Sequence, residues 1–225
     1  PTASEGKLTL FKVKYFDDTA YLTQSWQLYA ETLIFSLEKI YCNSPCFRAE
    51  KSKTSRHLAE FYMAEMEMAW VKLDGVIKYA EELIAFIVER VLEKNKDELA
   101  ILKQDIKKLE KIKAPFKHIT YTEVLEILKK DGIDVTWGKD LRTIEEDQLM
   151  KHFDAPVVVT HYPKKIMAFY KPRDTKNPET ALCFDILAPE GYGEIVGGSE
   201  RDTNIDELKK ALKIKRKRGL PNPAR

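Results

Sequence analysis

Apolar residues recur along the chain with two different spacings, and each spacing predicts a different secondary structure. Alternation of apolar and polar positions is typical of a strand with one buried face, whereas recurrence every three or four residues is typical of an amphipathic helix. Alternation over 8–21, interrupted by Asp17 and Asp18, predicts a β-hairpin. Helical spacing over 27–40 predicts a helix that closes on the break Asn43-Ser44-Pro45.

Two strand-like runs follow this helix, with a short polar segment between them. The first run covers 46–50, and the second covers 61–70, which is rich in aromatic residues and methionine. The segment between them includes 51–56, which contains only lysine, arginine, serine and threonine. This arrangement predicts two strands joined by a charged loop.

A helical block occupies the middle of the chain. Its longest member begins at Asp74 and keeps one apolar face, formed by Val76, Ile77, Ala80, Leu83, Ile84, Ile87, Val88 and Val91. The segment 95–113 is dense in charge but keeps apolar residues at helical spacing, which predicts a solvated helix or, alternatively, a flexible insert. Two more helices are expected, over 122–130 and over 141–153.

Short apolar runs after Pro156 predict a block of strands. The expected strands are 157–159, 167–170, 182–187 and a fourth that begins at 194. A final helix is expected over 206–212. Because helices and strands form separate blocks and do not alternate as βαβ units, we expect an α+β fold, an antiparallel sheet flanked by helices, rather than a doubly wound fold.

Charge is distributed unevenly along the chain. The 225 residues include 38 basic and 36 acidic side chains, yet residues 209–225 contain eight basic residues and no acidic one. We therefore expect a mildly acidic folded core over 1–212 and a basic tail over 213–225. The tail either contacts nucleic acid, or is a solvated end or the start of a helix that leads into a further segment.

Cysteine usage and hydropathy indicate the compartment. Cys42, Cys46 and Cys183 are too few for a disulfide framework, and their odd number favours a reducing environment. Cys42 and Cys46 have no second pair at ligand spacing, so thiols in the core or in loops are expected rather than zinc ligands. No apolar run is long enough to cross a bilayer. We expect a cytoplasmic protein with no membrane partner.

Three clusters of residues carry candidate chemistry, and the first suits phosphate. Phe47-Arg48-Ala49-Glu50 is followed by a basic loop, by Arg56-His57 and by Phe61. An arginine on a strand beside such a loop can bind phosphate, because the guanidinium fork matches phosphate oxygens. The alternative is a surface hairpin of alternating charge.

The second cluster is the pair Glu65 and Glu67. Residues two apart in a strand share a face, so both carboxylates point the same way. Burying such a pair is costly, and Met63, Ala69 and Trp70 surround it. This setting favours a functional role over a strand that simply faces solvent.

The third cluster combines carboxylates, glycines and an arginine over 185–201. Asp185 and Glu194 stand at the ends of neighbouring predicted strands and could hold Mg²⁺, which prefers hard oxygen ligands and substrate phosphates. The glycines at 191, 193, 197 and 198 let the backbone approach a ligand closely. Arg201 follows directly.

In this order the three clusters resemble class II aminoacyl-tRNA synthetases. The family's second signature motif is a Phe-Arg-x-Glu strand, a variable loop and a strand with a phenylalanine, which 47–61 fits. Residues 24–29 resemble the Gln-Ser-Pro-Gln-Leu segment of the aspartyl/asparaginyl subgroup, with Trp26 in place of the proline. Residues 56–58 and 193–201 also match that subgroup. The resemblance covers 2–212 and implies a class II catalytic core over most of the chain.

Two positions favour asparagine over aspartate as the substrate. The aspartyl enzymes carry a lysine where this chain has Ala30 and an aspartate where it has Glu65. Loss of the ammonium removes the partner of a substrate carboxylate, and a glutamate can accept a hydrogen bond from a carboxamide NH₂. The resemblance is therefore strongest to asparaginyl enzymes of the archaeal type.

The resemblance implies a role for each site residue. Those for ATP are Arg48 at the α-phosphate, Glu50 at the adenine edge, His57 at the outer phosphates, Phe61 stacked on adenine, and Glu194, with Arg48, Glu50 and His57 as the catalytic set. Those for the amino acid are Glu5, Ser25, Gln27, Glu65 and Arg201, while Asp185 and Glu194 hold Mg²⁺. The implied reaction is activation of asparagine by ATP and transfer to tRNA(Asn).

The resemblance also implies segments outside this sequence. The family's first motif, which builds a dimer interface, is expected before Thr2, and its third motif, which binds ATP, is expected beyond the final helix. The chain is thus expected to be part of a catalytic domain that is homodimeric in the intact protein. The alternatives are an ammonia-using asparagine synthetase relative, an inactive module that binds asparagine or nucleotide, and an aspartyl enzyme.

Overall fold

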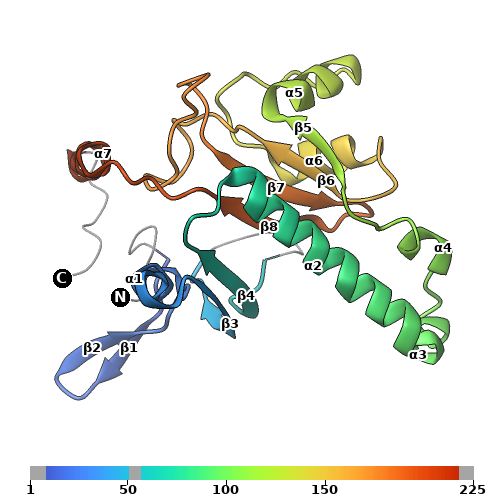
Figure 1. Cartoon of the computed structure of the whole chain (residues 1–225), viewed down its shortest axis with the longest axis horizontal. Helices are drawn as coiled ribbons and strands as arrows, with labels where there is room; N and C mark the ends of the chain where they lie inside the picture. Colours follow the sequence, from blue (N-terminus) through green and yellow to red (C-terminus); the bar gives the residue numbers. More distant parts are fainter. Residues whose placement is uncertain (1–8, 51–56, 218–225) are drawn as a thin grey trace. The chain divides into compact units, whose positions relative to one another are not determined.

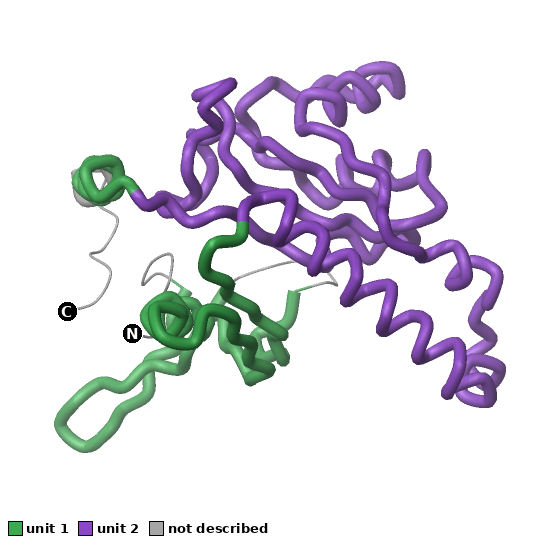
Figure 2. The backbone as a smooth tube through the Cα atoms, viewed as in Figure 1, with its two compact units in different colours: residues 1–71, 204–225 green, residues 72–203 purple. Residues whose placement is uncertain are grey.

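A computed structural model describes residues 9–50 and 57–217 of the chain, and the side chains among them up to residue 213. The chain forms two compact units (Figure 2). The first comprises 1–71 together with 204–225, and the second comprises 72–203. Each unit has its own sheet structure, as the strand pairing shows.

The first unit begins with the predicted hairpin, which the structure confirms. β1 (Lys12–Tyr15) pairs antiparallel with β2 (Asp18–Tyr21). The turn lies at 16–17, one residue earlier than expected. The predicted helix is also present as α1 (Gln27–Leu37), but it ends earlier than expected because Glu38 adopts a left-handed φ of 59°.

The two predicted strands of the first unit are present, but the first both begins and ends earlier than predicted. β3 (Lys39–Phe47) pairs antiparallel with β4 (Glu60–Met68) along its whole length, so the expected break at 43–45 lies inside a strand. β4 is the one strand paired with β3 among the described residues, and a strand with a free edge tolerates a proline such as Pro45. α7 (Ile205–Lys217) completes this unit and extends five residues beyond its predicted end.

The second unit contains a four-stranded sheet in the order β5-β6-β7-β8 (Figure 1). Its members are β5 (Lys117–Thr120), β6 (Val157–Thr160), β7 (Cys183–Ala188) and β8 (Gly193–Ser199). The pairs β6–β7 and β7–β8 are antiparallel, as the expected α+β fold requires. The short β5 was not predicted, and it pairs in parallel with β6.

Helices cover this sheet. α2 (Leu73–Lys94), α5 (Tyr121–Lys130) and α6 (Thr143–Met150) confirm three predicted helices, whereas the predicted helix over 95–113 is divided into α3 (Lys96–Ile101) and α4 (Ile106–Leu109). The division falls where Lys103 adopts a left-handed φ of 53°. No helix within the described ranges has both the length and the apolar composition to span a membrane.

Strand alternation gives the sheet a buried face on each side. Val157 and Val159 belong to a core cluster with residues of α5 and α6, such as Leu128 and Leu149. Val158 points to the opposite face and is also fully buried. α2 contacts this sheet through Glu81, a buried carboxylate that accepts hydrogen bonds from the backbone of β5's neighbour Phe116 and from His118 on β5.

The predicted strand over 167–170 was wrong, because this segment is a loop of turns. The Lys164 ammonium donates to the backbone carbonyls of Ala168 and Phe169 at 3.4 Å each, and also to that of Lys171. These carbonyls converge on one cation and are not directed at a neighbouring strand. The run of apolar residues over 167–170 therefore predicted a strand where the backbone is in fact curved.

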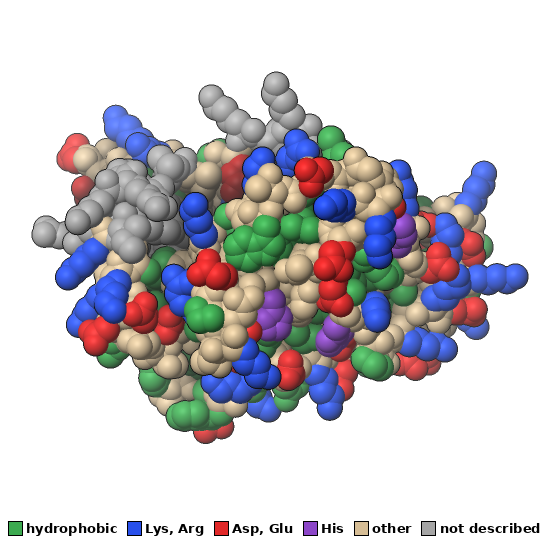
Figure 3. Space-filling view, turned by 90° about the horizontal axis from the view of Figure 1, so that it is seen from above, with side chains coloured by type: hydrophobic (Ala, Val, Ile, Leu, Met, Phe, Trp, Pro, Cys, Tyr) green, Lys and Arg blue, Asp and Glu red, His purple; other side chains and the backbone are tan. Residues whose placement is uncertain are grey.

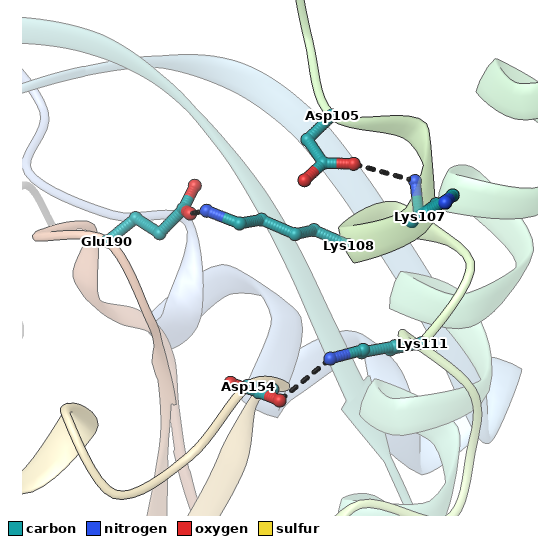
Figure 4. A network of polar contacts seen from close by, with 6 residues as sticks. All are labelled: Asp105, Lys107, Lys108, Lys111, Asp154 and Glu190. Carbon is teal, nitrogen blue, oxygen red and sulfur yellow. Dashed lines mark hydrogen bonds and ion pairs between the residues drawn. The ribbon is translucent and has the colours of Figure 1, made fainter.

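Two ion pairs connect α4 and its following turn to distant loops of the same unit (Figure 4). Lys108 pairs with Glu190 in the β7–β8 turn, and Lys111 pairs with Asp154 before β6 at 2.7 Å. All four side chains are substantially exposed, so each pair contributes little to stability. Basic and acidic side chains are likewise interspersed over the face shown in Figure 3.

Candidate functional site

The first group of predicted site residues lies at the N-terminus of α1. The Glu65 carboxylate on β4 accepts a hydrogen bond from the Ser25 hydroxyl at 2.6 Å and another from the Trp26 backbone N–H at 2.8 Å. The Ser25 hydroxyl oxygen in turn accepts from the backbone N–H of Gln27. A carboxylate is favoured at the positive end of a helix dipole, so Glu65 is held in one orientation.

Glu65 keeps capacity for a substrate in this position. An ionised carboxylate has about four lone-pair sites, and the two contacts use only part of them. Ala30, the position at which aspartyl enzymes carry lysine, is completely buried. This part of the chain therefore has a carboxylate at position 65 and no ammonium at position 30, a combination that suits a carboxamide NH₂ better than a carboxylate.

Gln27 lies on the first turn of α1 and is 7% exposed. Its side-chain amide donates to Glu31 at 2.8 Å, one helical turn further on. Glu67 is also buried and shares the inward face of β4 with Glu65, as the spacing predicted. Glu5, predicted to contact the amino acid, lies outside the described residues.

The predicted nucleotide-binding residues of the first unit lie where β3 ends and β4 begins. The Arg48 backbone N–H donates to Ala59, so pairing extends one step beyond the strands. The Arg48 guanidinium stands 5.4 Å from the centroid of the Phe61 ring, a cation–π distance. Glu50 and His57 are exposed, and residues 51–56 between them lie outside the described ranges. Arg48 and Phe61 are thus brought together.

The second unit brings Asp185 and Glu194 together by means of a β-bulge. Asp185 pairs with Gly197, Ile186 with Val196, and Leu187 with Glu194, so Ile195 is an extra residue in β8. Residues three apart in a regular strand face opposite sides, but the extra residue returns Glu194 to the face of Gly197 and Asp185. Bulges of this kind re-aim side chains beside functional sites.

Gly197 leaves the space that the two carboxylates occupy. A Cβ at this position would lie 2.8 Å from Glu194 Oε1 and 3.4 Å from Asp185 Oδ1. Burial, together with the neighbouring Glu194 charge, raises the pKa of Asp185 to about 8. A hydrogen bond with the buried Tyr162 hydroxyl opposes this rise. Two adjacent carboxylates that repel one another are a favourable setting for a cation.

The donor set fits a magnesium ion that is held largely by its substrate. Within residues 9–50 and 57–217, no group of three or more His, Cys, Asp and Glu side chains is arranged to hold a metal ion. Mg²⁺ commonly uses one or two carboxylates and completes its shell with water and substrate phosphates. Asp185 and Glu194 can supply those two carboxylates.

Arg201 lies after β8, and hydrogen bonds of its neighbours Glu200 and Asp202 fix the backbone on both sides of it. The Glu200 carboxylate accepts from the backbone N–H of Leu73 at the start of α2, and the backbone N–H of Asp202 donates to the Tyr170 carbonyl. The Arg201 guanidinium donates to the Ser199 hydroxyl at 2.9 Å and stands 4.9 Å from the Tyr170 ring centroid.

Three contributors to the site were not predicted from the sequence. Tyr162 contacts Asp185, Tyr170 contacts Arg201, and Ile195 forms the bulge. The signal for Tyr162 was its place two residues beyond the end of β6, a strand of buried valines, where a side chain with a polar end can reach the edge of the sheet. No local pattern identifies the bulge or the Tyr170 contact.

These features define a member of a known family. The chain belongs to the family described as tRNA synthetases class II (D, K and N), whose pattern matches residues 1–223. Among curated relatives, asparagine–tRNA ligase of Pyrococcus abyssi is 49% identical over 211 residues, which are 94% of this chain and 49% of that protein. The corresponding ligase of Thermococcus gammatolerans is 48% identical over 206 residues, 92% of this chain and 48% of that protein.

Solved structures give the same family and the same fold. Asparaginyl-tRNA synthetase from Pyrococcus horikoshii complexed with asparaginyl-adenylate has a TM-score of 0.91 and 46% identity, covering 97% of this chain and 50% of that one. Aspartyl-tRNA synthetase from Entamoeba histolytica has a TM-score of 0.74 and 28% identity, covering 89% of this chain and 42% of that one. The chain spans about half the length of the curated relatives it matches.

Proposed function

We propose that this chain is part of the catalytic domain of an enzyme that activates asparagine with ATP and transfers it to tRNA(Asn). The observation that carries the proposal is the Glu65 carboxylate held at the N-terminus of α1, with alanine rather than lysine at position 30, together with relatives named as asparagine–tRNA ligases. The greater similarity to asparaginyl than to aspartyl structures supports the same choice.

The proposed reaction has two steps. An oxygen of the asparagine carboxylate bonds to the α-phosphorus of ATP, and the bond to the pyrophosphate leaving group breaks. A hydroxyl of the terminal tRNA ribose then bonds to the activated carbonyl carbon, and AMP leaves as the hydroxyl proton is released. Both steps depend mainly on positioning and on neutralising phosphate charge.

The residues of the nucleotide end have distinct proposed roles. Arg48 binds the α-phosphate, and its contact with Phe61 places the guanidinium beside the ring on which adenine stacks. Glu50 accepts from the adenine edge, and His57 binds the outer phosphates. A Mg²⁺ ion held by Asp185 and Glu194 would neutralise charge on the phosphates, and its binding would keep both carboxylates ionised.

The residues of the amino-acid end recognise asparagine in this proposal. Glu65 accepts from the carboxamide NH₂, while Arg201 donates to the carboxamide oxygen. Ser25 and Gln27 contact the backbone end of the substrate, and Glu5 reaches its amino group. Because Glu65 already accepts from Ser25 and from the α1 N-terminus, its carboxylate does not have to be ordered when asparagine binds.

The same proposal covers the organisation of the intact protein. We propose that 1–212 is a catalytic core, that 213–225 is a basic tail, and that the intact enzyme is a cytoplasmic homodimer. The 17 residues from 209 onward carry eight basic and no acidic side chains, which supports the separate character of the tail.

ATP–pyrophosphate exchange with the intact protein tests this function. Exchange should require asparagine, ATP and Mg²⁺, and should be followed by charging of tRNA(Asn). Formation of free asparagine from aspartate, ATP and ammonia without tRNA would instead support the asparagine synthetase relative. Binding of asparagine with no exchange would support the inactive module.

A further inference from the structure

We infer that Lys164 is a positioning residue for Arg201, because it holds the loop that places Tyr170 against the guanidinium of that side chain. The inference rests on the proposed function only in giving Arg201 a role toward the substrate. The Lys164 loop is defined here as residues 163–171.

Lys164 fixes the curvature of this loop from within. Its ammonium donates to the carbonyls of Ala168 and Phe169 and to that of Lys171, which are the residues on both sides of Tyr170 in the chain. Lys164 is partly buried, and burial together with the nearby Arg173 lowers the pKa of its ammonium. Partial burial strengthens each contact between the cation and a carbonyl dipole.

Tyr170 links this loop to Arg201 by two separate contacts. The Tyr170 carbonyl accepts from the Asp202 backbone N–H at 2.7 Å, and the Tyr170 ring lies 4.9 Å from the Arg201 guanidinium carbon. The guanidinium is also tied to Ser199 on β8. The direction of the Arg201 side chain therefore depends on β8 from one side and on the Lys164 loop from another.

The backbone around Arg201 is held independently of the loop. Glu200 accepts from the N-terminus of α2, and its own backbone N–H donates to Leu182. Loss of the Lys164 ammonium would leave three carbonyls without this donor and would let the loop relax, yet it would leave the Arg201 backbone in place. The predicted consequence is a misdirected guanidinium rather than a collapsed sheet.

The test compares three variants of the intact protein in ATP–pyrophosphate exchange. Lys164→Met keeps most of the side chain but removes the charge, and it should lower kcat/KM for asparagine by about 10- to 100-fold, as expected for a catalytic group displaced by about 1 Å. The KM for ATP should change little. Lys164→Arg should restore most of the activity, and the exposed neighbour Lys165→Met should match the wild type.

Two results would overturn the inference. One is wild-type kinetics for Lys164→Met, and the other is an equal loss toward asparagine and ATP, which would indicate a purely structural role. If Lys164→Met fails to fold, Tyr170→Leu provides the second test, since it removes the ring but leaves the Lys164 contacts. It should show the same selective loss for asparagine, and its failure to do so would also overturn the inference.

A spectroscopic readout separates this inference from the proposed function. The Arg201 Nε–H signal in ¹⁵N NMR, assigned with Arg201→Lys, should carry a ring-current shift from Tyr170. Lys164→Met should abolish that shift, whereas Lys165→Met should keep it. A wild-type protein with no asparagine-dependent exchange would refute the proposed function, while an unchanged Arg201 signal in Lys164→Met would refute the role of Lys164.

Discussion

Replacing each of the two adjacent glycines of β8 by alanine should separate the chemistry of the site from the stability of the fold. A Cβ on Gly197 would lie 2.8 Å from Glu194 Oε1, which is the end of an exposed and flexible side chain. A Cβ on Gly198 would lie 2.3 Å from the ring of Phe184, which is 1% exposed. One substitution must displace a carboxylate, and the other must displace a packed aromatic ring.

The two variants are expected to differ in how much the free energy of unfolding changes. In Gly197→Ala the Glu194 carboxylate can rotate away, and the lower entropy of the unfolded chain offsets about 0.4–1 kcal/mol of any strain, so the free energy of unfolding should change by less than about 1 kcal/mol. In Gly198→Ala the Phe184 ring has no free space, and overpacking of this kind costs about 1–3 kcal/mol. The corresponding fall in Tm is roughly 2–12 °C.

Two measurements on both variants check this reasoning. Thermal unfolding should show a fall in Tm for Gly198→Ala only. ATP–pyrophosphate exchange over a range of Mg²⁺ concentrations should show that Gly197→Ala requires a higher Mg²⁺ concentration, because the Asp185 and Glu194 carboxylates no longer lie next to one another. An unchanged Mg²⁺ requirement in Gly197→Ala, or a Tm of Gly198→Ala equal to that of the wild type, would refute the reasoning.

Two further predictions concern local parts of the structure. Thr120→Ala removes the hydroxyl that accepts from the Glu123 backbone N–H at the start of α5, and it should lower the free energy of unfolding by about 1 kcal/mol in denaturant titrations. Hydrogen bonds from the Thr120 backbone and hydroxyl lower the pKa of Glu123, so the stabilisation by the Glu123 carboxylate should be complete above about pH 4.5 and should be lost as the pH falls through the folded-state pKa. Because alanine keeps the backbone donor, Thr120→Ala should keep most of this pH dependence, and its complete loss in that variant would contradict the reasoning. The double substitution Ala30→Lys with Glu65→Asp should shift the amino-acid preference in exchange assays from asparagine toward aspartate. Because residue 30 is buried, the new ammonium is stable only when it is paired with a carboxylate. An unchanged preference would mean that other residues determine the specificity.

Patterns that depend on neighbouring residues predicted the fold well. The hairpin β1–β2, the strand β4 and the helix α2 each follow from apolar spacing within a single segment. The pairing of β3 with β4 was expected, but the start of β3 was predicted too late in the sequence, because Asn43-Ser44-Pro45 is typical of a turn. Strand pairing over nine residues overrides that local preference.

Features that depend on distant contacts were not predictable in the same way. β5 has only four residues, and its place in the sheet comes from parallel pairing with β6, some forty residues away. The loop over 167–170 carries apolar residues like a strand, but its curvature depends on the Lys164 ammonium. Neither contact leaves a periodic signal in the sequence.

The candidate site was likewise predictable in its residues but not in its geometry. The chemistry of the residues singled out the carboxylates Glu65, Asp185 and Glu194, whereas the role of Arg201 toward the substrate was predicted from the resemblance to the family. The geometry that makes them a site depends on register: the Trp26 backbone contact to Glu65 joins residues 39 apart, and the bulge at Ile195 decides which face Glu194 occupies. Register is a property of the folded sheet rather than of any short segment.

The most direct test of the central claim is a side-by-side measurement of ATP–pyrophosphate exchange with asparagine and with aspartate on the intact protein. A pocket in which the Glu65 carboxylate has no ammonium at position 30 should accept a carboxamide and repel a second carboxylate. We predict that kcat/KM for asparagine exceeds that for aspartate by at least about 100-fold. Equal or faster exchange with aspartate would contradict the account.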